Sequence, residues 1–394
     1  MKILMLVNKS PFPPNDGSSL AMNAMVRGFV LADWEVSLLV MNTSKHRKDP
    51  KDLPEELKAK VEMRFVNLNN KPSPITGFFN LFSKESYIVS RFKHQGYAEA
   101  LEKYLGEKEF DYVQIEGLTP CHYIEQIRSQ SKAKLINRAH NVEHLIWLRT
   151  AMYETNFLKA AYLQLQANRL KKFEMSRLPL FDAVVPITPI DKAMFKSLGL
   201  KVPMISAYCA IDFHNREVEN WQGEIDFFFV GAFDWQPNLQ GMRWFLKEVW
   251  PIVIQSQPKA VIHVLGRHCP ADIAAIENVV VYDDILDASK FYSKHKVLVV
   301  PLRSGSGLRI KIVEGMSMGK AVVTTSIGVE GISAEPGVEI KLANDPKAFA
   351  MEMIDLYTNP KVAKHMGKKA REFAEKRFNQ NSVSKELIQF YQSL

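Results

Sequence analysis

The chain alternates short apolar runs with stretches of helical periodicity along almost its whole length, and this alternation constrains its fold more than any other feature. The runs of the first half are KILMLVN (residues 2–8), EVSLLVMN (35–42), VEMRFVNL (61–68), YVQIEG (112–117), KLINRAH (134–140), AVVPIT (183–188) and VPMISA (202–207). Strands that are separated by helices pair in parallel, and the helices cover the faces of the sheet. The sequence therefore predicts an α/β fold with parallel sheets.

A polar segment between Ile205 and Gln222 interrupts the alternation, which then starts again. The second series comprises IDFFFVG (225–231), AVIHVLG (260–266), NVVVYDD (278–284), KVLVVPL (296–302), AVVTTS (321–326) and VEIKLA (338–343). With 394 residues, the chain exceeds the roughly 250–300 residues at which one core stops growing. We therefore expect two similar α/β domains, residues 1–207 and 208–379.

Composition narrows the class of protein. Hydrophobic residues make up 46% and charged residues 24%, the balance of a globular chain, and no apolar run approaches the roughly 18 residues of a spanning helix. No secretory leader is visible, so we expect a cytoplasmic protein. The three cysteines form no C-x-x-C pair, which argues against a disulfide frame or a thiolate metal site. A formal charge of +8 favours anionic partners, but no basic stripe of a nucleic-acid module is present, so nucleic acid is not expected.

The stretch over residues 297–325 indicates an anion site. A buried strand is predicted to end at Pro301, the following loop holds Gly305, Ser306 and Gly307, and a helix comes next. Glycines let the backbone approach a ligand closely, and the free N–H groups at a helix start favour a phosphate.

Three charged residues follow this loop. Arg309 and Lys311 are two positions apart, so they can reach one diphosphate only if Arg309 lies in the loop or the first helical turn. Lys311 and Glu314 share a helix face, which places a cation for phosphate beside a carboxylate that can accept hydrogen bonds from a sugar diol. A surface ion pair between Lys311 and Glu314 is the alternative.

His140, Glu143 and His144 spell H-x-x-E-H, which is also a zinc peptidase signature. Zinc binding requires both histidines on one face of one helix. Here His140 is predicted to end a strand, whereas His144 falls in the next helix, so we prefer a ligand-facing His140 to a zinc ligand, with a structural histidine as the alternative. Carboxyl ends of parallel strands are where ligands bind, and this also selects Asn141 and Glu116.

Two segments of the chain resemble those of a known family. GSGLRIKIVEGMSMGKAVVTTSIGVEG (305–331) and FFFVGAFDWQPNLQGMRWFLKEVWP (227–251) resemble the nucleotide-sugar half of a GT-B glycosyltransferase of family 4, the glycosyl transferases group 1. PFPPNDGSS (11–19) and RAHNVE (138–143) are similar to the acceptor half. The resemblance covers nearly the whole chain in order.

The resemblance implies two Rossmann-like domains facing each other across a cleft, with a final helix near residues 380–394 packing back on the first domain. It implies retaining, hexosyl-type transfer from a nucleoside-diphosphate sugar to a glycan or lipid-linked acceptor, in the biosynthesis of a surface polysaccharide. Glu314 would contact the donor ribose and His140 would lie near the reacting sugar. The donor diphosphate would be held by Gly17, Gly305, Ser306, Gly307, Leu308, Arg309 and Lys311.

The chain departs from the family pattern at Ser306, where members often carry a glutamate that touches the donor sugar. A basic residue usual after the first strand of the donor domain is also missing from GAFDWQPN, and Arg309 and Lys311 would replace its charge. A non-catalytic sugar-nucleotide-binding protein and a nucleotide-sugar epimerase are therefore the alternatives. No D-x-D pair occurs, so neither a cofactor nor an obligatory metal is expected.

Two segments of the first half fit the sheet-and-helix rhythm poorly. One is the aromatic stretch over residues 72–92, for which inward packing is the first expectation and an exposed acceptor or membrane-facing surface the second. The other is a long helical pattern over about residues 141–176. Together with the positive charge, the aromatic stretch is compatible with peripheral contact at the inner membrane face.

Overall fold

The computed structural model describes residues 1–14, 16–44, 47–152, 154–213, 221, 223–283, 288–305 and 307–394. It divides into two compact units, Met1–Ala210 with Gln380–Leu394, and Ile211–Asn379. Within these described ranges, no helix combines the length and the apolar character that crossing a bilayer requires.

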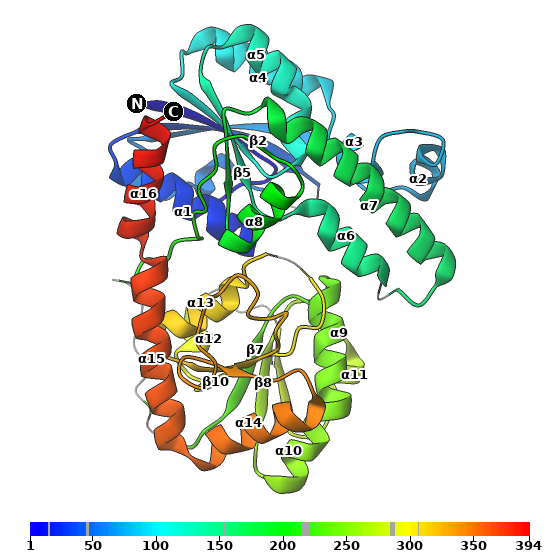
Figure 1. Cartoon of the computed structure of the whole chain (residues 1–394), viewed down its shortest axis with the longest axis vertical. Helices are drawn as coiled ribbons and strands as arrows, with labels where there is room; N and C mark the ends of the chain where they lie inside the picture. The colour runs from blue at the N-terminus through cyan, green and yellow to red at the C-terminus, as the bar shows by residue number, and fades with distance from the viewer. Residues whose placement is uncertain are drawn as a thin grey trace. The chain divides into compact units, whose positions relative to one another are not determined.

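The first unit is built on a parallel sheet whose described strands follow the order β3-β2-β1-β4-β5-β6 (Figure 1). The strands are β1 (Lys2–Val7), β2 (Glu35–Thr43), β3 (Val61–Leu68), β4 (Tyr112–Glu116), β5 (Lys134–Ala139) and β6 (Ala183–Pro186). Their order reverses between β1 and β4, and in open parallel sheets ligands bind at the carboxyl ends of the strands beside such a reversal.

Helices cover both faces of this sheet. They are α1 (Gly17–Leu31), α2 (Pro74–Asn80), α3 (Tyr87–Ser90), α4 (Gln95–Glu107), α5 (Ile124–Gln130), α6 (Glu143–Met152), α7 (Phe157–Arg177), α8 (Pro189–Ser197) and α16 (Gln380–Gln392). Successive side chains of β1 enter opposite cores: Ile3 and Met5 pack with α1 and α16, whereas Leu4 packs with α4. The strands are therefore apolar runs without polar alternation, as buried parallel strands are.

Two local expectations are wrong. Residues 202–207 add no strand to the sheet, and only Met204 forms an isolated bridge, to Val184; Pro203 has no N–H to donate to a ladder. The single helix expected over residues 141–176 is divided into α6 and α7. Asn156 accepts a hydrogen bond from the Lys159 N–H at 3.0 Å and starts α7, the usual role of asparagine at a helix N-terminus.

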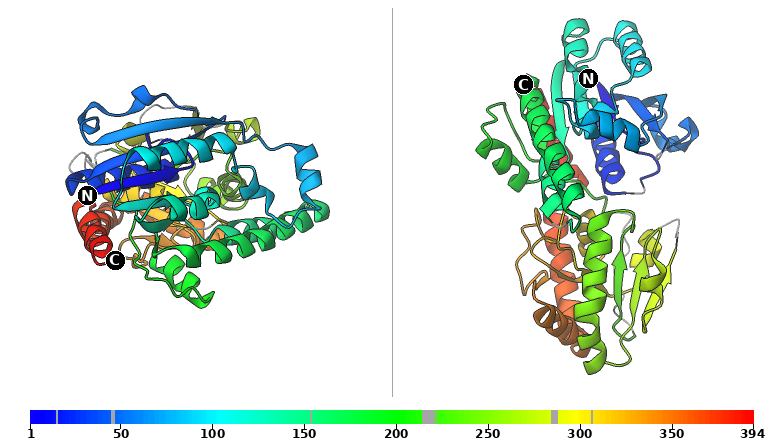
Figure 2. Two further views of the ribbon diagram at one scale, coloured as in Figure 1. Left: turned by 90° about the horizontal axis from the view of Figure 1, so that it is seen from above. Right: turned by 90° about the vertical axis from the view of Figure 1, so that its right-hand side faces the viewer.

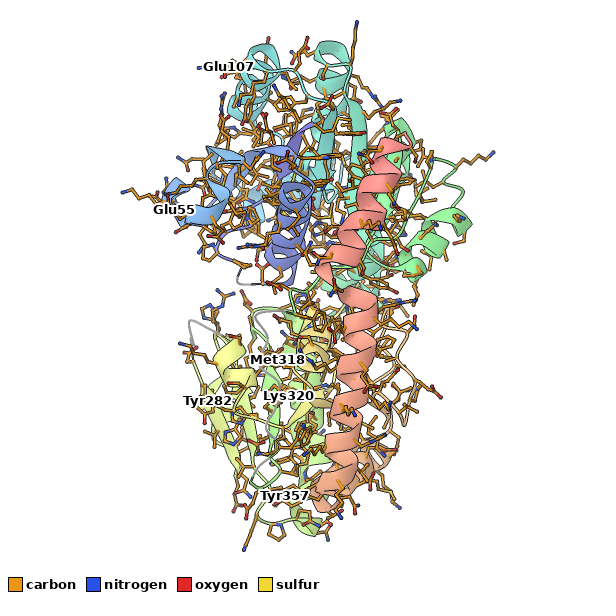
Figure 3. All side chains as sticks on the ribbon, turned by 90° about the vertical axis from the view of Figure 1, so that its left-hand side faces the viewer. Glu55, Glu107, Tyr282, Met318, Lys320 and Tyr357 are labelled. Atoms are coloured by element: carbon orange, nitrogen blue, oxygen red, sulfur yellow. The ribbon has the colours of Figure 1, made fainter. Side chains whose placement is uncertain are left out.

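The second unit repeats the architecture, with described strands in the order β12-β11-β10-β7-β8-β9. They are β7 (Phe227–Val230), β8 (Ile262–Leu265), β9 (Val279–Tyr282), β10 (Val297–Val300), β11 (Ala321–Thr324) and β12 (Lys341–Leu342), and Figure 3 shows Tyr282 on the edge strand β9. The helices are α9 (Gln236–Trp244), α10 (Trp250–Ser256), α11 (Ala271–Ala274), α12 (Ala288–Tyr292), α13 (Ile310–Ser317), α14 (Pro346–Thr358) and α15 (Pro360–Phe378). The order reverses between β7 and β10, so the loops after these two strands are the ones placed to bind a ligand.

Candidate functional site

The loop after β10 contains two glycines in a left-handed backbone conformation. Gly305 and Gly307 have φ values of 109° and 81°, a region that residues with a side chain rarely adopt. Arg309 is the residue before α13, and no side chain caps the helix start. The Ile310 and Ile312 amides donate to the Leu308 and Arg309 carbonyls at 3.1 and 2.9 Å, so the positive end of the helix dipole and the glycine backbone are what this loop offers an anion. Ser306, which the sequence placed in the same site, lies outside the described residues.

Arg309 lies in the loop before α13. This is the placement that the sequence analysis required for Arg309 and Lys311 to reach the same ligand. Its side chain is almost fully buried, and its Nη1 donates to the Gly307 carbonyl at 2.5 Å. Its guanidinium carbon lies 5.9 Å from the centre of the Trp235 ring. A buried guanidinium that ties the loop backbone to a ring holds both the turn and its positive charge in place.

Lys311 turns toward the loop after β7. Its Nζ donates to Asn238 Oδ1 at 2.9 Å and lies 4.4 Å from the centre of the Phe229 ring. Burial, and next the charge of Arg309, lower the pKa of Lys311 to about 7. Its nitrogen thus lies beside the loop after β7, the segment in which the sequence lacks a basic residue. Asn238 also donates to the Ala232 carbonyl at 2.8 Å, which fixes its amide.

Glu314 lies one turn into α13 and is partly exposed. Its helix rests closely on β10, because a Cβ on Gly315 would come within 2.7 Å of Leu298 Cδ2. Leu308 is also partly exposed at the end of the loop. The structure therefore gathers the predicted donor residues Gly305, Gly307, Leu308, Arg309, Lys311 and Glu314 into one loop and the helix that follows it.

In the first unit, the structure joins His140 to Glu116. His140 follows β5 and Glu116 ends the neighbouring strand β4, and His140 Nε2 lies 2.5 Å from Glu116 Oε2. Glu116 is buried, and its other oxygen accepts a hydrogen bond from Gln114. Gln114 in turn accepts from the Tyr391 hydroxyl of α16 at 2.5 Å. A polar chain thus runs from the last helix to the histidine.

The other ring nitrogen of His140 faces the start of α1. Ser18 Oγ lies 3.4 Å from His140 Nδ1, and Gly17 is the first residue of the helix. Asp16 caps this helix through the Ser19 N–H. Burial raises the pKa of Asp16, but the charge of Lys9 and hydrogen bonds to Lys9 and Ser19 outweigh it and lower the pKa to about 2.

The two histidines of H-x-x-E-H have separate partners. His144 Nδ1 lies 2.5 Å from Glu174 Oε2 in α7, so His144 holds α6 to α7. Asn141 does not join His140 but donates to Glu143 Oε1 at 3.3 Å. Burial, and next the charge of Glu174, raise the pKa of Glu143 to about 7.

Among the described residues, Asp226, His263 and His295 form a group whose ligand atoms lie within 4.8 Å of one another. Histidine and carboxylate together are ligands that a transition metal accepts. Asp226 precedes β7 and His295 precedes β10, so the group lies at the amino ends of the strands. The loop that holds Gly305 and Gly307 follows the carboxyl end of β10, so the group lies at the opposite end of the sheet from that loop.

Comparison with known proteins agrees with this geometry. Residues 224–359 match the profile of the family described as Glycosyl transferases group 1. The matched residues lie in the second unit, which therefore resembles that of a group 1 glycosyltransferase. The chain has the GT-B fold, since sucrose-phosphate synthase from Thermosynechococcus elongatus superposes on it with a TM-score of 0.73 at 15% identity, over 100% of this chain and 99% of the other.

Two further proteins are similar to this chain over nearly its whole length. Anabaena HepE, solved in complex with UDP-glucose, superposes with a TM-score of 0.67 at 15% identity over 100% of both chains. A Klebsiella pneumoniae protein described as an uncharacterized 44.6 kDa protein in cps region is 22% identical over 399 residues, which is 97% of each chain.

Proposed function

We propose that the protein is a glycosyltransferase that moves a sugar, with retention of anomeric configuration, from a nucleoside-diphosphate sugar to a glycan or lipid-linked acceptor in surface polysaccharide assembly. The observation that carries the proposal is the loop before α13, in which Gly305 and Gly307 have positive φ and which leads directly to Arg309 and Lys311. The cps-region relative and the UDP-glucose complex of HepE support the pathway and the donor class.

In this proposal the second unit binds the donor. The amides of Gly307 and Leu308, with the charges of Arg309 and Lys311, stabilise the diphosphate as it leaves with extra negative charge. Glu314, one turn further on, accepts hydrogen bonds from the ribose hydroxyls. No metal is assigned a role, because these cationic groups supply the charge that the leaving diphosphate needs.

His140 positions a reacting group in the first unit. An ionised Glu116 can only accept hydrogen bonds, so it selects the His140 tautomer with the proton on Nε2. Nδ1 then carries a lone pair, which accepts a hydrogen bond from a hydroxyl group. We assign His140 the positioning of a sugar hydroxyl, while the departing diphosphate takes the proton of the acceptor.

A panel of nucleotide sugars tests the proposal. The purified protein is incubated with each donor and with extracts containing acceptors, and the products are followed by NMR. A new α-linked product from an α-linked donor is expected. Donor binding without transfer or hydrolysis would instead favour a sugar-nucleotide-binding protein, and an isomerised donor would favour an epimerase.

A further inference from the structure

A pocket of about 630 Å³ opens in the first unit between α2, α6 and α7. Its walls are mainly apolar and aromatic, with Phe78 and Leu81 from the α2 region, Trp147 from α6 and Leu163 from α7. A volume of roughly 300–1,000 Å³ is typical of pockets that hold small ligands. Neither His140 nor any other residue predicted to bind the substrates lines it, so the pocket is separate from the site described above.

The pocket is held open by bonds between α2 and α7, which lie side by side in Figures 1 and 2. Gln166 of α7 donates to Asn80 Oδ1 at 2.9 Å, and Arg169 donates to the Asn80 and Leu81 carbonyls at 2.8 and 2.9 Å. Gln166 also accepts from the Tyr87 N–H at 2.7 Å. These polar contacts fix the walls without filling the space between them.

One cation lines this apolar space. Arg91 is half-buried at the pocket, and its Nε reaches the Ile88 carbonyl at 3.4 Å. Within the part of the chain that the structure describes, no carboxylate lies within ion-pair distance of Arg91, and the nearby titratable groups are the phenols of Tyr87 and Tyr162. A partly desolvated guanidinium among apolar walls is complementary to a ligand that joins an apolar chain to an anion.

Large apolar side chains are exposed on the segments that line the pocket. Phe78, Phe79 and Phe82 are 59%, 67% and 80% exposed, and Phe157 and Leu158 at the start of α7 are 80% and 77% exposed. Phe78 itself lines the pocket, and its ring centre lies 5.8 Å from that of Phe82. Exposed aromatic groups of this kind mark contact with a membrane interface or a partner, and they would sit at the level of lipid headgroups. The expectation that residues 72–92 pack inward is therefore wrong for these side chains.

We propose that this pocket binds a long-chain lipid phosphate, with its first isoprenoid or alkyl units between α2 and α7 and its phosphate on Arg91. The exposed phenylalanines then rest in the bilayer interface from which the lipid enters. The inference rests on the proposed function, because it names the acceptor class as a sugar carried on a lipid phosphate. The lone cation favours this occupant over a neutral lipid or an apolar peptide, neither of which would neutralise Arg91.

Vesicle co-sedimentation of the full chain tests the inference. Phosphatidylcholine vesicles with and without a polyisoprenyl phosphate are compared, and inorganic phosphate and farnesyl phosphate are titrated in solution. We expect binding to be about tenfold tighter when the vesicles contain the lipid phosphate, as one charge-assisted contact provides. Farnesyl phosphate should compete, whereas inorganic phosphate should not, because it lacks the apolar chain.

Two variants act on different parts of the pocket. Arg91→Gln removes the cation. Gly77→Leu fills the space, since a Cβ at Gly77 meets only Tyr162 Oη at 3.7 Å. Each should abolish the preference for lipid phosphate. Gly106→Leu is the matched control, because Gly106 lies on the exposed side of α4 with no atom within 4 Å of its Cβ position, and it should bind as the wild type does.

Equal binding to both kinds of vesicle, or a preference unchanged in Arg91→Gln and Gly77→Leu, would overturn the inference. The assay needs no sugar transfer, so it is independent of the proposed activity. Lipid-phosphate binding without turnover of any nucleotide sugar would reject the proposed function alone. Turnover without lipid-phosphate binding would reject the pocket assignment alone.

Discussion

The ammonium nitrogen of Lys311 lies 2.5 Å from the point where a side chain on Gly231 would begin. Gly231 follows β7 and Lys311 belongs to α13, so the loops after the two central strands of the second sheet meet at this contact. The Asn238 amide nitrogen is equally close, at 2.6 Å from the same point. The absence of a side chain at Gly231 is therefore what allows the lysine to reach its place.

Gly231→Ala should displace Lys311 and weaken the binding of a nucleoside diphosphate by about 1.5–3 kcal/mol, the range for a hydrogen bond to a charged group. The atoms that the new methyl meets belong to the Lys311 and Asn238 side chains and not to the backbone, so the fold should persist. Isothermal titration with UDP and GDP measures the affinity. Gly106→Ala, with open space around its Cβ position, is the control. Unchanged affinity of Gly231→Ala for the nucleotide would show that Lys311 does not contribute to diphosphate binding.

Nucleotide binding should take up a proton near pH 8. In the free protein the pKa of Lys311 is lowered to about 7, chiefly by burial, so the amine is mostly neutral at pH 8. A bound diphosphate favours the ammonium and raises this pKa, so affinity should fall as the pH rises above 7. Titrations in buffers of different ionisation enthalpy measure the uptake. Lys311→Met should bind the nucleotide more weakly and take up no proton. A proton uptake equal to that of the wild type would show that Lys311 is not the group that is protonated on binding.

Glu314→Ala should weaken nucleoside diphosphate binding by about 1–3 kcal/mol if the carboxylate accepts hydrogen bonds from ribose. Affinity for inorganic pyrophosphate, which has no ribose, should change little. This comparison separates the ribose role from a general loss of structure at α13. Equal losses for the two ligands would count against the ribose contact and in favour of a structural role for Glu314.

The donor loop was largely predictable from sequence, whereas its partners were not. Gly305 and Gly307 mark a turn between a buried strand and a helix, and that pattern is local in the sequence. Asn238 bonds to Lys311 across 73 positions, and nothing in QPNLQ distinguishes this asparagine from a helix-surface residue. The prediction of a strand at residues 202–207 was wrong for a related reason. Apolar composition does not reveal whether a neighbouring strand is available to pair with the segment.

In the first unit, the neighbouring strands β4 and β5 explain why Glu116 and His140 meet. Both were selected as strand ends, but their contact requires the pairing order of the sheet, which a single sequence does not give. The exposure of the phenylalanines near α2 was equally hidden. By composition, an aromatic cluster is expected in a hydrophobic core. The exposed fractions of Phe78, Phe79 and Phe82 show that these side chains lie on the surface. Gln166 and Arg169 hold the segment there through bonds to Asn80 and Leu81.

Glu116→Gln should lower turnover by about a hundredfold, with little effect on donor affinity, because the amide no longer fixes the His140 tautomer. Steady-state kinetics with the active donor measure both quantities, and nitrogen NMR of the imidazole reports the tautomer. His140→Ala should be at least as slow. The double variant should be no slower than His140→Ala, since both changes act through one ring. Additive losses would show that Glu116 acts independently of His140.

Glu143→Gln should stabilise the protein at pH 8. The pKa of Glu143 is raised from an ordinary 4.5 to about 7, first by burial and then by Glu174, so between these two values the folded chain binds more protons than the unfolded chain. Stability then falls as the pH rises from 4.5 to 7. Glutamine keeps the shape of the protonated group without the charge. Urea unfolding should show a gain on the order of 2 kcal/mol at pH 8 and almost none at pH 4. The control is Glu102→Gln on the exposed side of α4, which should leave the stability unchanged at both pH values. Equal stability of Glu143→Gln and the wild type at pH 8 would mean that Glu143 is not held in a protonated state.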